Sequence, residues 1–181
     1  MRQFIICGHE APTTPEFSLS DLAGGAGRLD VLCRCVNAGL FVSHGIREDS
    51  RVHLVLDDQY TVRFDGSAAK RLYPNERAVA SRIRGALEST ADAIGHQPAE
   101  VSPGVELYRM GFESTLESVA RDGMIIELHE DGEPLVESHP PTHPGRGVGP
   151  HPRGGVGRAG YQPRGVPRAP VAPNGAGGGI E

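Results

Sequence analysis

The sequence predicts an α/β fold, in which a mostly parallel sheet is flanked by helices. Two observations support this class. Short apolar runs alternate along the chain with segments whose apolar residues recur at helical spacing. The chain has 181 residues, room for one ordinary domain, and no apolar run long enough to cross a membrane.

The first strand and helix are expected in residues 2–40. Residues 2–7 (RQFIIC) form a short apolar run that predicts a buried strand. A Pro-rich segment and a long loop ending in GGAG follow. A continuous apolar stripe over about four turns then predicts a helix that packs on the sheet; it consists of Leu29, Leu32, Cys33, Val36 and Leu40.

Further elements are expected up to residue 128. VHLVL (52–56) predicts a second buried strand, and YTVRF (60–64) predicts its partner, joined through DDQ. Residues 74–89 predict a helix with Pro74 near its start and Glu76 in its first turn; Val79, Ile83 and Leu87 form its apolar face. A loop and short strand (101–109), a short helix (111–120) and a buried strand MIIEL (124–128) follow. The inward residues of the short helix are Phe112, Leu116 and Val119.

The composition changes abruptly after about residue 137. Of the 43 residues at 139–181, 34 are Gly, Pro, Arg, Ala or Val. Without apolar periodicity, such a segment cannot bury enough surface to offset the entropy lost on ordering. We therefore divide the chain into a domain at 1–138 and a disordered, low-complexity tail at 139–181.

Charge and cysteine content limit the function classes. Residues 1–138 carry 13 Lys and Arg against 22 Asp and Glu, whereas the tail carries five Arg and one Glu. An acidic domain does not attract nucleic acid globally, so any RNA contact needs a local arginine patch. Three cysteines suit a reducing compartment, and the polar amino terminus does not resemble a signal peptide, which predicts a cytoplasmic protein. The histidines show no metal-ligand spacing.

One helix face carries candidate functional residues. Asp30, Arg34 and Asn37 lie at i, i+4 and i+7 on the first predicted helix, opposite its apolar stripe, and Arg47 lies beyond its end. Such a face binds a base and its phosphate, or is an exposed surface with an Asp30–Arg34 ion pair. The GGAG loop followed by Arg28 is a phosphate loop or a flexible turn. Spacing alone favours the second interpretation in both cases.

Longer motifs carry a family resemblance. MRQFIICGHEAPTTPEFSLSDL, GAGRLDVLCRCVNAGLFVSHGIR, LYPNERAVASRIRGALE, SPGVELYRMGFE and IIELHEDG closely resemble the archaeal tRNA (pseudouridine-54 N1)-methyltransferases of the SPOUT superfamily. The resemblance covers roughly residues 1–138.

This resemblance implies a specific enzyme. Its members have an α/β fold with a carboxy-terminal trefoil knot, act as homodimers, and transfer a methyl group from S-adenosylmethionine to a pseudouridine in the T-loop of tRNA. It implies that Asp30 orients or deprotonates the base and that Arg34 contacts phosphate or base. Arg28, Asn37 and Arg47 become substrate-binding residues, and Leu128 becomes the first cofactor contact.

The chain departs from the family pattern after this strand. Family members continue into a VLSDH segment and then a GPxxLHADHxIxxxHNYLD segment, which thread the knot and build most of the cofactor pocket. Neither occurs here; HPPTHPGRGVGPHPRGG stands in place of the first. We interpret the tail as the product of a reading-frame shift near Glu137, which leaves the knot half incomplete. The alternative to an enzyme is a non-catalytic RNA-binding module or an inactive remnant.

Overall fold

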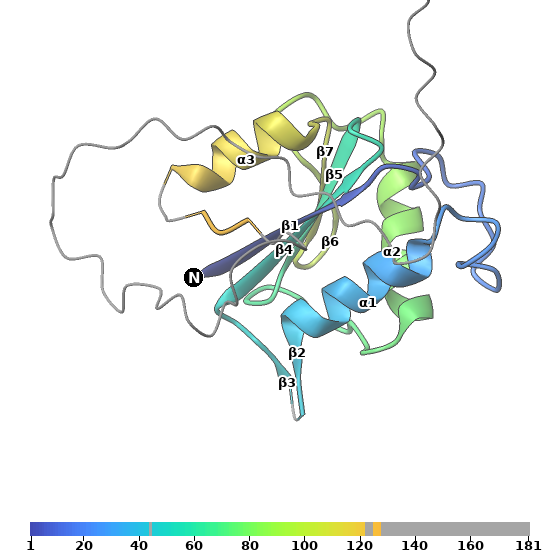
Figure 1. Ribbon diagram of the computed structural model, residues 1–181, viewed down its shortest axis with the longest axis horizontal. Helices are drawn as coiled ribbons and strands as arrows, with labels where there is room; N and C mark the ends of the chain where they lie inside the picture. Colours follow the sequence, from blue (N-terminus) through green and yellow to red (C-terminus); the bar gives the residue numbers. More distant parts are fainter. Residues whose placement is uncertain (44, 122–124, 128–181) are drawn as a thin grey trace, which may run out of the picture.

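The computed structural model describes residues 1–43, 45–121 and 125–127. Leu128 and the predicted tail at 139–181 lie outside these residues. The described part contains a five-stranded sheet in the order β1-β4-β5-β7-β6, flanked by helices (Figure 1). Its strands are β1 (Arg2–Gly8), β4 (Ser50–Leu56), β5 (Tyr60–Asp65), β6 (Ala99–Ser102) and β7 (Val105–Tyr108). The predicted α/β class is confirmed.

The sheet is mixed, so the prediction of a mostly parallel sheet is wrong for the described residues. Only β1 and β4 pair in parallel, because helix α1 (Leu29–Leu40) forms the crossover between them. β4 and β5 are joined by the short DDQ turn, in which Asp57 and Asp58 both have positive φ, and β6 and β7 by a Pro-Gly turn. Such short connections permit only antiparallel neighbours.

Helices α1 and α2 (Glu76–Glu88) pack on one face of the sheet. The predicted apolar stripes of both helices are buried there against alternate residues of β4, β5 and β7, such as Leu54, Phe64 and Leu107. Helix α2 begins one residue after Asn75, whose side chain accepts a hydrogen bond from the Ala78 amide at 2.8 Å. Helix α1 ends at Leu40, where the small hairpin of β2 (Phe41–Val42) and β3 (Gly45–Ile46) projects from the body.

Helix α3 (Phe112–Ala120) lies on the opposite face, as Figure 1 shows. Its buried Thr115 hydroxyl lies 2.7 Å from that of Thr61 on β5, whose hydroxyl also donates to the Met110 carbonyl at 2.9 Å. The three residues predicted to face inward, Phe112, Leu116 and Val119, are only partly buried. The helix is therefore confirmed, and its most buried side chain is a hydroxyl-bearing Thr115 instead of the predicted apolar residues.

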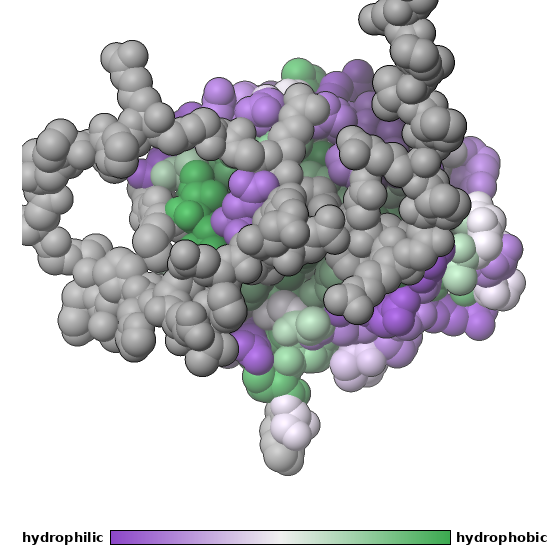
Figure 2. All heavy atoms as spheres, in the orientation of Figure 1, coloured by the Kyte–Doolittle hydropathy of each residue, from purple (hydrophilic) through white to green (hydrophobic). Residues whose placement is uncertain are grey.

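The predicted strand at 124–128 is wrong for its described part. Residues 125–127 form no strand, and Ile125 and Ile126 are 52% and 49% exposed. Figure 2 shows a hydrophobic patch where Figure 1 draws this segment. Among the described residues β1 pairs with β4 on one edge only, and residues 125–127 do not pair with its other edge, so this apolar run is not buried in the sheet.

A buried histidine lies on the α3 side of the sheet. His53 of β4 is 5% exposed, and its Nε2 lies 3.0 Å from the Gln3 side-chain oxygen on β1. Burial, and then the nearby Arg63 and Arg51 guanidinium groups, lower the pKa of His53 to about 4, although Asp65 opposes the shift. The imidazole is therefore neutral in the folded protein at neutral pH.

This histidine predicts acid sensitivity. A base whose pKa falls from 6.5 to about 4 on folding binds a proton more readily when unfolded, so stability is lost as pH decreases through this window. We expect the free energy of unfolding to fall by about 2 kcal/mol between pH ~7 and pH ~5. Urea unfolding at both pH values measures it. His53→Gln is expected to lose most of this difference, and an unchanged difference in that variant would contradict the assignment.

Candidate functional site at the amino end of helix α1

The β1–α1–β4 unit places the start of α1 near the carboxyl ends of β1 and β4. In open α/β sheets, ligands bind at this edge. Close packing fixes the helix there: a Cβ added at Gly8, the last residue of β1, would lie 2.6 Å from Leu32 Cδ1. The long loop at 9–28 returns the chain to this point, and its last residue, Arg28, adopts a left-handed conformation with φ 59°.

Gly27 holds this loop against the end of β1. It has φ +53°, and a Cβ added there would lie 1.7 Å from the Glu10 carbonyl oxygen. The position therefore excludes every side chain both by conformation and by space. The glycine of the GGAG motif serves packing, and it sets the direction in which Arg28 leaves the loop.

A substitution tests this packing. We expect Gly27→Ala to lower the free energy of unfolding by more than about 3 kcal/mol, since strain and overlap with backbone add. Gly95→Ala is the matched control, because Gly95 has φ +55° but open space around its Cβ position; it is expected to cost only about 1 kcal/mol. Thermal or urea unfolding measures both, and equal losses would show that packing at Glu10 contributes nothing.

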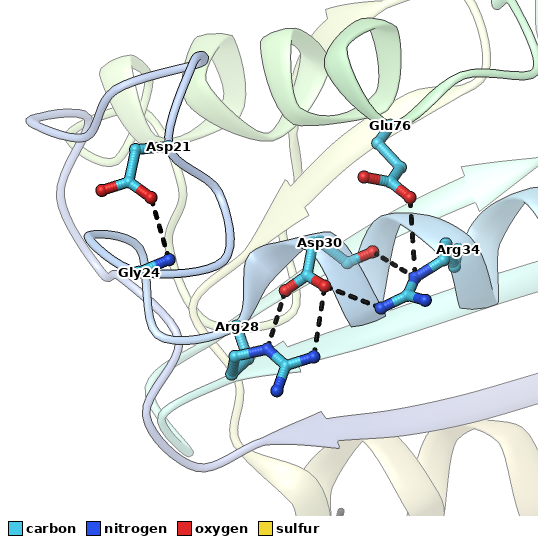
Figure 3. A network of polar contacts seen from close by, with 6 residues as sticks. All are labelled: Asp21, Gly24, Arg28, Asp30, Arg34 and Glu76. Carbon is cyan, nitrogen blue, oxygen red and sulfur yellow. Dashed lines mark hydrogen bonds and ion pairs between the residues drawn. The ribbon is translucent and has the colours of Figure 1, made fainter.

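Asp30 is the centre of a polar cluster at the start of α1 (Figure 3). Arg28 donates to its two carboxylate oxygens from Nε at 3.0 Å and Nη2 at 3.3 Å, and Arg34 Nη2 donates to Oδ2 at 2.7 Å. The Asp30 side chain is only 11% exposed, whereas those of Arg28 and Arg34 are 52% and 55% exposed. The carboxylate is therefore enclosed, and its two cations face outward.

These contacts fix the charge of Asp30. Hydrogen bonds from Arg28, together with the positive charges of Arg28 and Arg34, lower the pKa of the carboxyl group below 3.8 despite its burial. Asp30 is therefore ionised at neutral pH. A carboxylate with a lowered pKa accepts hydrogen bonds well but is a poor base for removing a proton.

Helix α2 completes the cluster through a residue that sequence reasoning missed. Arg34 Nε lies 3.5 Å from Oε1 of Glu76, the first residue of α2, and also donates to the Asp30 carbonyl at 3.4 Å. Sequence periodicity identified Glu76 only as a first-turn acid. Its contact with Arg34 requires α1 and α2 to pack side by side, which spacing along the chain does not encode.

The phosphate-loop interpretation receives no support from the geometry. The Gly24 amide already donates to the Asp21 carboxylate at 3.0 Å, as Figure 3 shows. In the first turn of α1, the amides of Leu29, Asp30 and Val31 donate to backbone carbonyls of the preceding loop. Amides with partners are not available to bind a phosphate, so this loop is a structural turn.

Asn37 and Arg47 lie away from the cluster. Asn37 is two turns further along α1, and its side-chain Oδ1 is buried without a hydrogen-bond donor in the described part of the chain. Arg47 lies near the carboxyl end of α1, where its amide donates to the Leu40 carbonyl at 2.7 Å. The helix is about 18 Å long, so the structure joins Arg28, Asp30 and Arg34 but separates Arg47 from them.

The cluster does not fit S-adenosylmethionine. Its carboxylate is already occupied by two guanidinium groups, and outward-facing cations repel a positively charged sulfonium. Leu128, the cofactor contact implied by the resemblance, lies outside the described residues. Among residues 1–43, 45–121 and 125–127, no group of three potential metal ligands occurs, and no helix there is long and apolar enough to span a membrane.

The fold and the site together define a class. This is an α/β protein with an ionised carboxylate and two exposed arginines at the strand ends, an arrangement suited to polar, anionic ligands. Residues 1–152 match the model of a family described as "Putative SAM-dependent RNA methyltransferase". The chain belongs to this family of RNA methyltransferases.

Individual relatives share most of their length with the chain. It is 66% identical over 144 residues to the tRNA (pseudouridine(54)-N(1))-methyltransferase of Haloferax volcanii, which covers 80% of this chain and 73% of that protein. The enzyme of the same name from Haloarcula marismortui is 64% identical over 144 residues, with the same coverage. That of Thermococcus kodakarensis is 40% identical over 159 residues, covering 83% and 79%.

Proposed function

We propose that residues 1–138 form the truncated domain of an enzyme that methylates N1 of pseudouridine 54 in the T-loop of tRNA with S-adenosylmethionine as donor, and that this chain lacks part of the donor pocket. The observation that carries this proposal is the 66% identity over 144 residues to an enzyme named for that reaction. The geometry of the α1 cluster is consistent with it, because two exposed arginines flank a carboxylate at the edge of the sheet where ligands bind.

In this proposal, Asp30 orients the base. N1 of pseudouridine is an imide-type nitrogen that must lose a proton before or during attack on the methyl group. An ionised carboxylate accepts a hydrogen bond from that N–H and stabilises the positive charge that develops on the ring, and the N1 proton then passes to solvent water. The lowered pKa of Asp30 favours this orienting role over proton removal.

The surrounding cations would hold the RNA backbone. Arg34 uses part of its guanidinium group on Asp30 and Glu76, yet its side chain remains 55% exposed. A guanidinium group has five N–H donors, so contacts to a phosphate remain possible. Arg28 would act similarly beside it, whereas Asn37, further along α1, and Arg47, near the carboxyl end of α1, would contact neighbouring nucleotides.

The donor pocket is proposed to lie beyond the described residues. From the family resemblance we expect this pocket at Leu128 and in the SPOUT knot that follows; we also expect a homodimer interface in that region and action in the cytoplasm. The sequence after Glu137 lacks the segments that build this pocket. We therefore propose that the tail at 139–181 results from a frame shift; translating the gene around codon 137 in all three frames is expected to recover VLSDH and LHADH.

A second candidate follows from this tail. If the donor pocket is incomplete, the chain is a non-catalytic RNA-binding module or an inactive remnant. Methyl transfer to T-arm RNA that carries pseudouridine at position 54 distinguishes the two functions. Mass spectrometry measures this transfer. An enzyme adds one methyl group to this RNA and none to the same RNA with uridine, because N1 of uridine is bonded to ribose. Absence of transfer by the chain, even when its carboxy-terminal part is replaced by that of a relative, would reject the proposed reaction.

A further inference from the structure

Helix α2 and the loop before it carry a concentration of positive charge. Residues 70–84 contain five of the 13 basic residues of the acidic domain at 1–138, against a single acid, Glu76. The basic residues are Lys70, Arg71, Arg77, Arg82 and Arg84. The remainder of the domain has eight basic residues and 21 acidic ones. This segment, which we name the α2 basic surface, is therefore opposite in charge to the domain around it.

These cations have no carboxylate partner in the part of the chain that the structure describes. None of the five takes part in an ion pair among the described residues, whereas Arg2, Arg28, Arg34, Arg51 and Arg63 all do. The single acid of the segment, Glu76, is engaged by Arg34. Unpaired positive charges that lie close together repel one another, and an anionic ligand relieves this repulsion.

One hydrogen bond to the backbone joins two of these cations. Arg71 adopts a left-handed conformation with φ 55°, and its carbonyl accepts a hydrogen bond from Arg82 Nη2 at 3.2 Å. A carbonyl acceptor fixes the position of the Arg82 guanidinium group but leaves its charge uncompensated. Lys70, Arg71 and Arg77 are exposed.

An aromatic ring lies within the same segment. Tyr73 is 61% exposed, among the most exposed of the large hydrophobic side chains in the described residues. An exposed ring between cations is the combination by which proteins bind single-stranded RNA, because bases stack on the ring while the cations contact phosphates. An acidic protein partner would account for the charge but not for the ring.

We propose that the α2 basic surface binds the sugar-phosphate backbone of a looped RNA and that Tyr73 stacks on one of its unpaired bases. This inference rests on the proposed function and names the surface that holds the substrate. The surface adjoins the Asp30 cluster, since Glu76 begins α2 and contacts Arg34 at 3.5 Å. A loop nucleotide at Asp30 thus has neighbouring phosphates within reach of α2, whose first nine residues span about 12 Å.

The test compares two double variants of the full chain. Lys70→Gln with Arg77→Gln removes two exposed charges of the surface, and Arg2→Gln with Arg121→Gln removes two exposed charges elsewhere. Binding to a fluorescent T-arm RNA hairpin is measured by anisotropy over a series of KCl concentrations. We expect the first variant to bind about tenfold more weakly, with the slope of log K against log salt reduced by about 1.4. The control is expected to change affinity less than about twofold.

Tyr73→Ala separates stacking from charge. We expect at least about fivefold weaker binding with an unchanged salt slope, because stacking does not release counterions. Melting curves confirm that the variants are folded, which their exposed positions favour. Polyglutamate is included as a competitor; if it displaces the RNA as well as unlabelled T-arm RNA does, the surface is a general polyanion site and the inference is rejected.

The outcomes distinguish the two proposals. If the unmodified chain prefers the T-arm hairpin to an unrelated hairpin but all variants bind equally, this surface does not bind the RNA and the proposed function is retained. If the unmodified chain shows no preference for the T-arm hairpin, both the proposed substrate and this inference are rejected.

Discussion

Residues 1–137 of this chain, joined to the matching carboxy-terminal segment of the Haloferax volcanii relative, are expected to bind S-adenosylmethionine at micromolar concentration. The unmodified 181-residue chain is expected to show no binding under the same conditions, a difference of at least about 100-fold. Isothermal calorimetry measures both. We expect the fusion to fold, because 66% identity over the shared 144 residues preserves core volume and packing.

The expected difference in donor binding follows from the positive charge of the sulfonium. The described residues place two outward-facing guanidinium groups at the strand ends of β1 and β4, and these repel a cation. We therefore propose that the donor pocket requires the carboxy-terminal segments of the family. The sequence there is rich in Gly, Pro and Arg and lacks the family segments.

Two controls sharpen this experiment. A fusion with the same carboxy-terminal residues in scrambled order is expected to show no donor binding. Micromolar binding by the unmodified chain would overturn the frame-shift interpretation and establish a complete enzyme. A cooperatively melting fusion that does not bind the donor would show that residues 1–137 do not provide the scaffold of the family fold.

Asp30→Asn in the active fusion is expected to slow methyl transfer by about 100-fold. The amide keeps the shape of the carboxylate but loses the negative charge that orients the N1–H group and stabilises developing positive charge. RNA affinity is expected to be equal or higher, because Arg28 and Arg34 lose the anion that neutralises them. Single-turnover rates and anisotropy measure the two quantities separately.

The opposite signs of these effects identify the role of Asp30. A residue that only positioned Arg34 would weaken RNA binding when changed, so a loss of affinity without a loss of single-turnover rate would contradict the orienting role. Asp21→Asn is the matched control, since its amide oxygen still accepts from the Gly24 amide, and its rate is expected to stay within about twofold of the parent fusion. The pKa of Asp30 lies below 3.8, so this carboxylate should cause no inflection in the rate above pH ~5.

The sequence determined those features that depend on neighbours along the chain. Helices α1 and α2 were predicted because their apolar residues recur with the helical period, and the Asp30–Arg34 ion pair follows from an i,i+4 spacing that any helix brings together. The DDQ turn was predicted for the same reason, since it joins adjacent strands. The family resemblance was also evident from sequence motifs alone.

Only the tertiary structure decided which distant residues meet. The pairing of Arg34 with Glu76, the contact of Gly27 with Glu10, and the mixed direction of the sheet depend on how whole elements pack and connect. Local spacing carries no information about such contacts, because their residues are separated by many freely varying positions. The lowered pKa of Asp30 likewise requires Arg28 in a left-handed conformation, which the loop packing imposes.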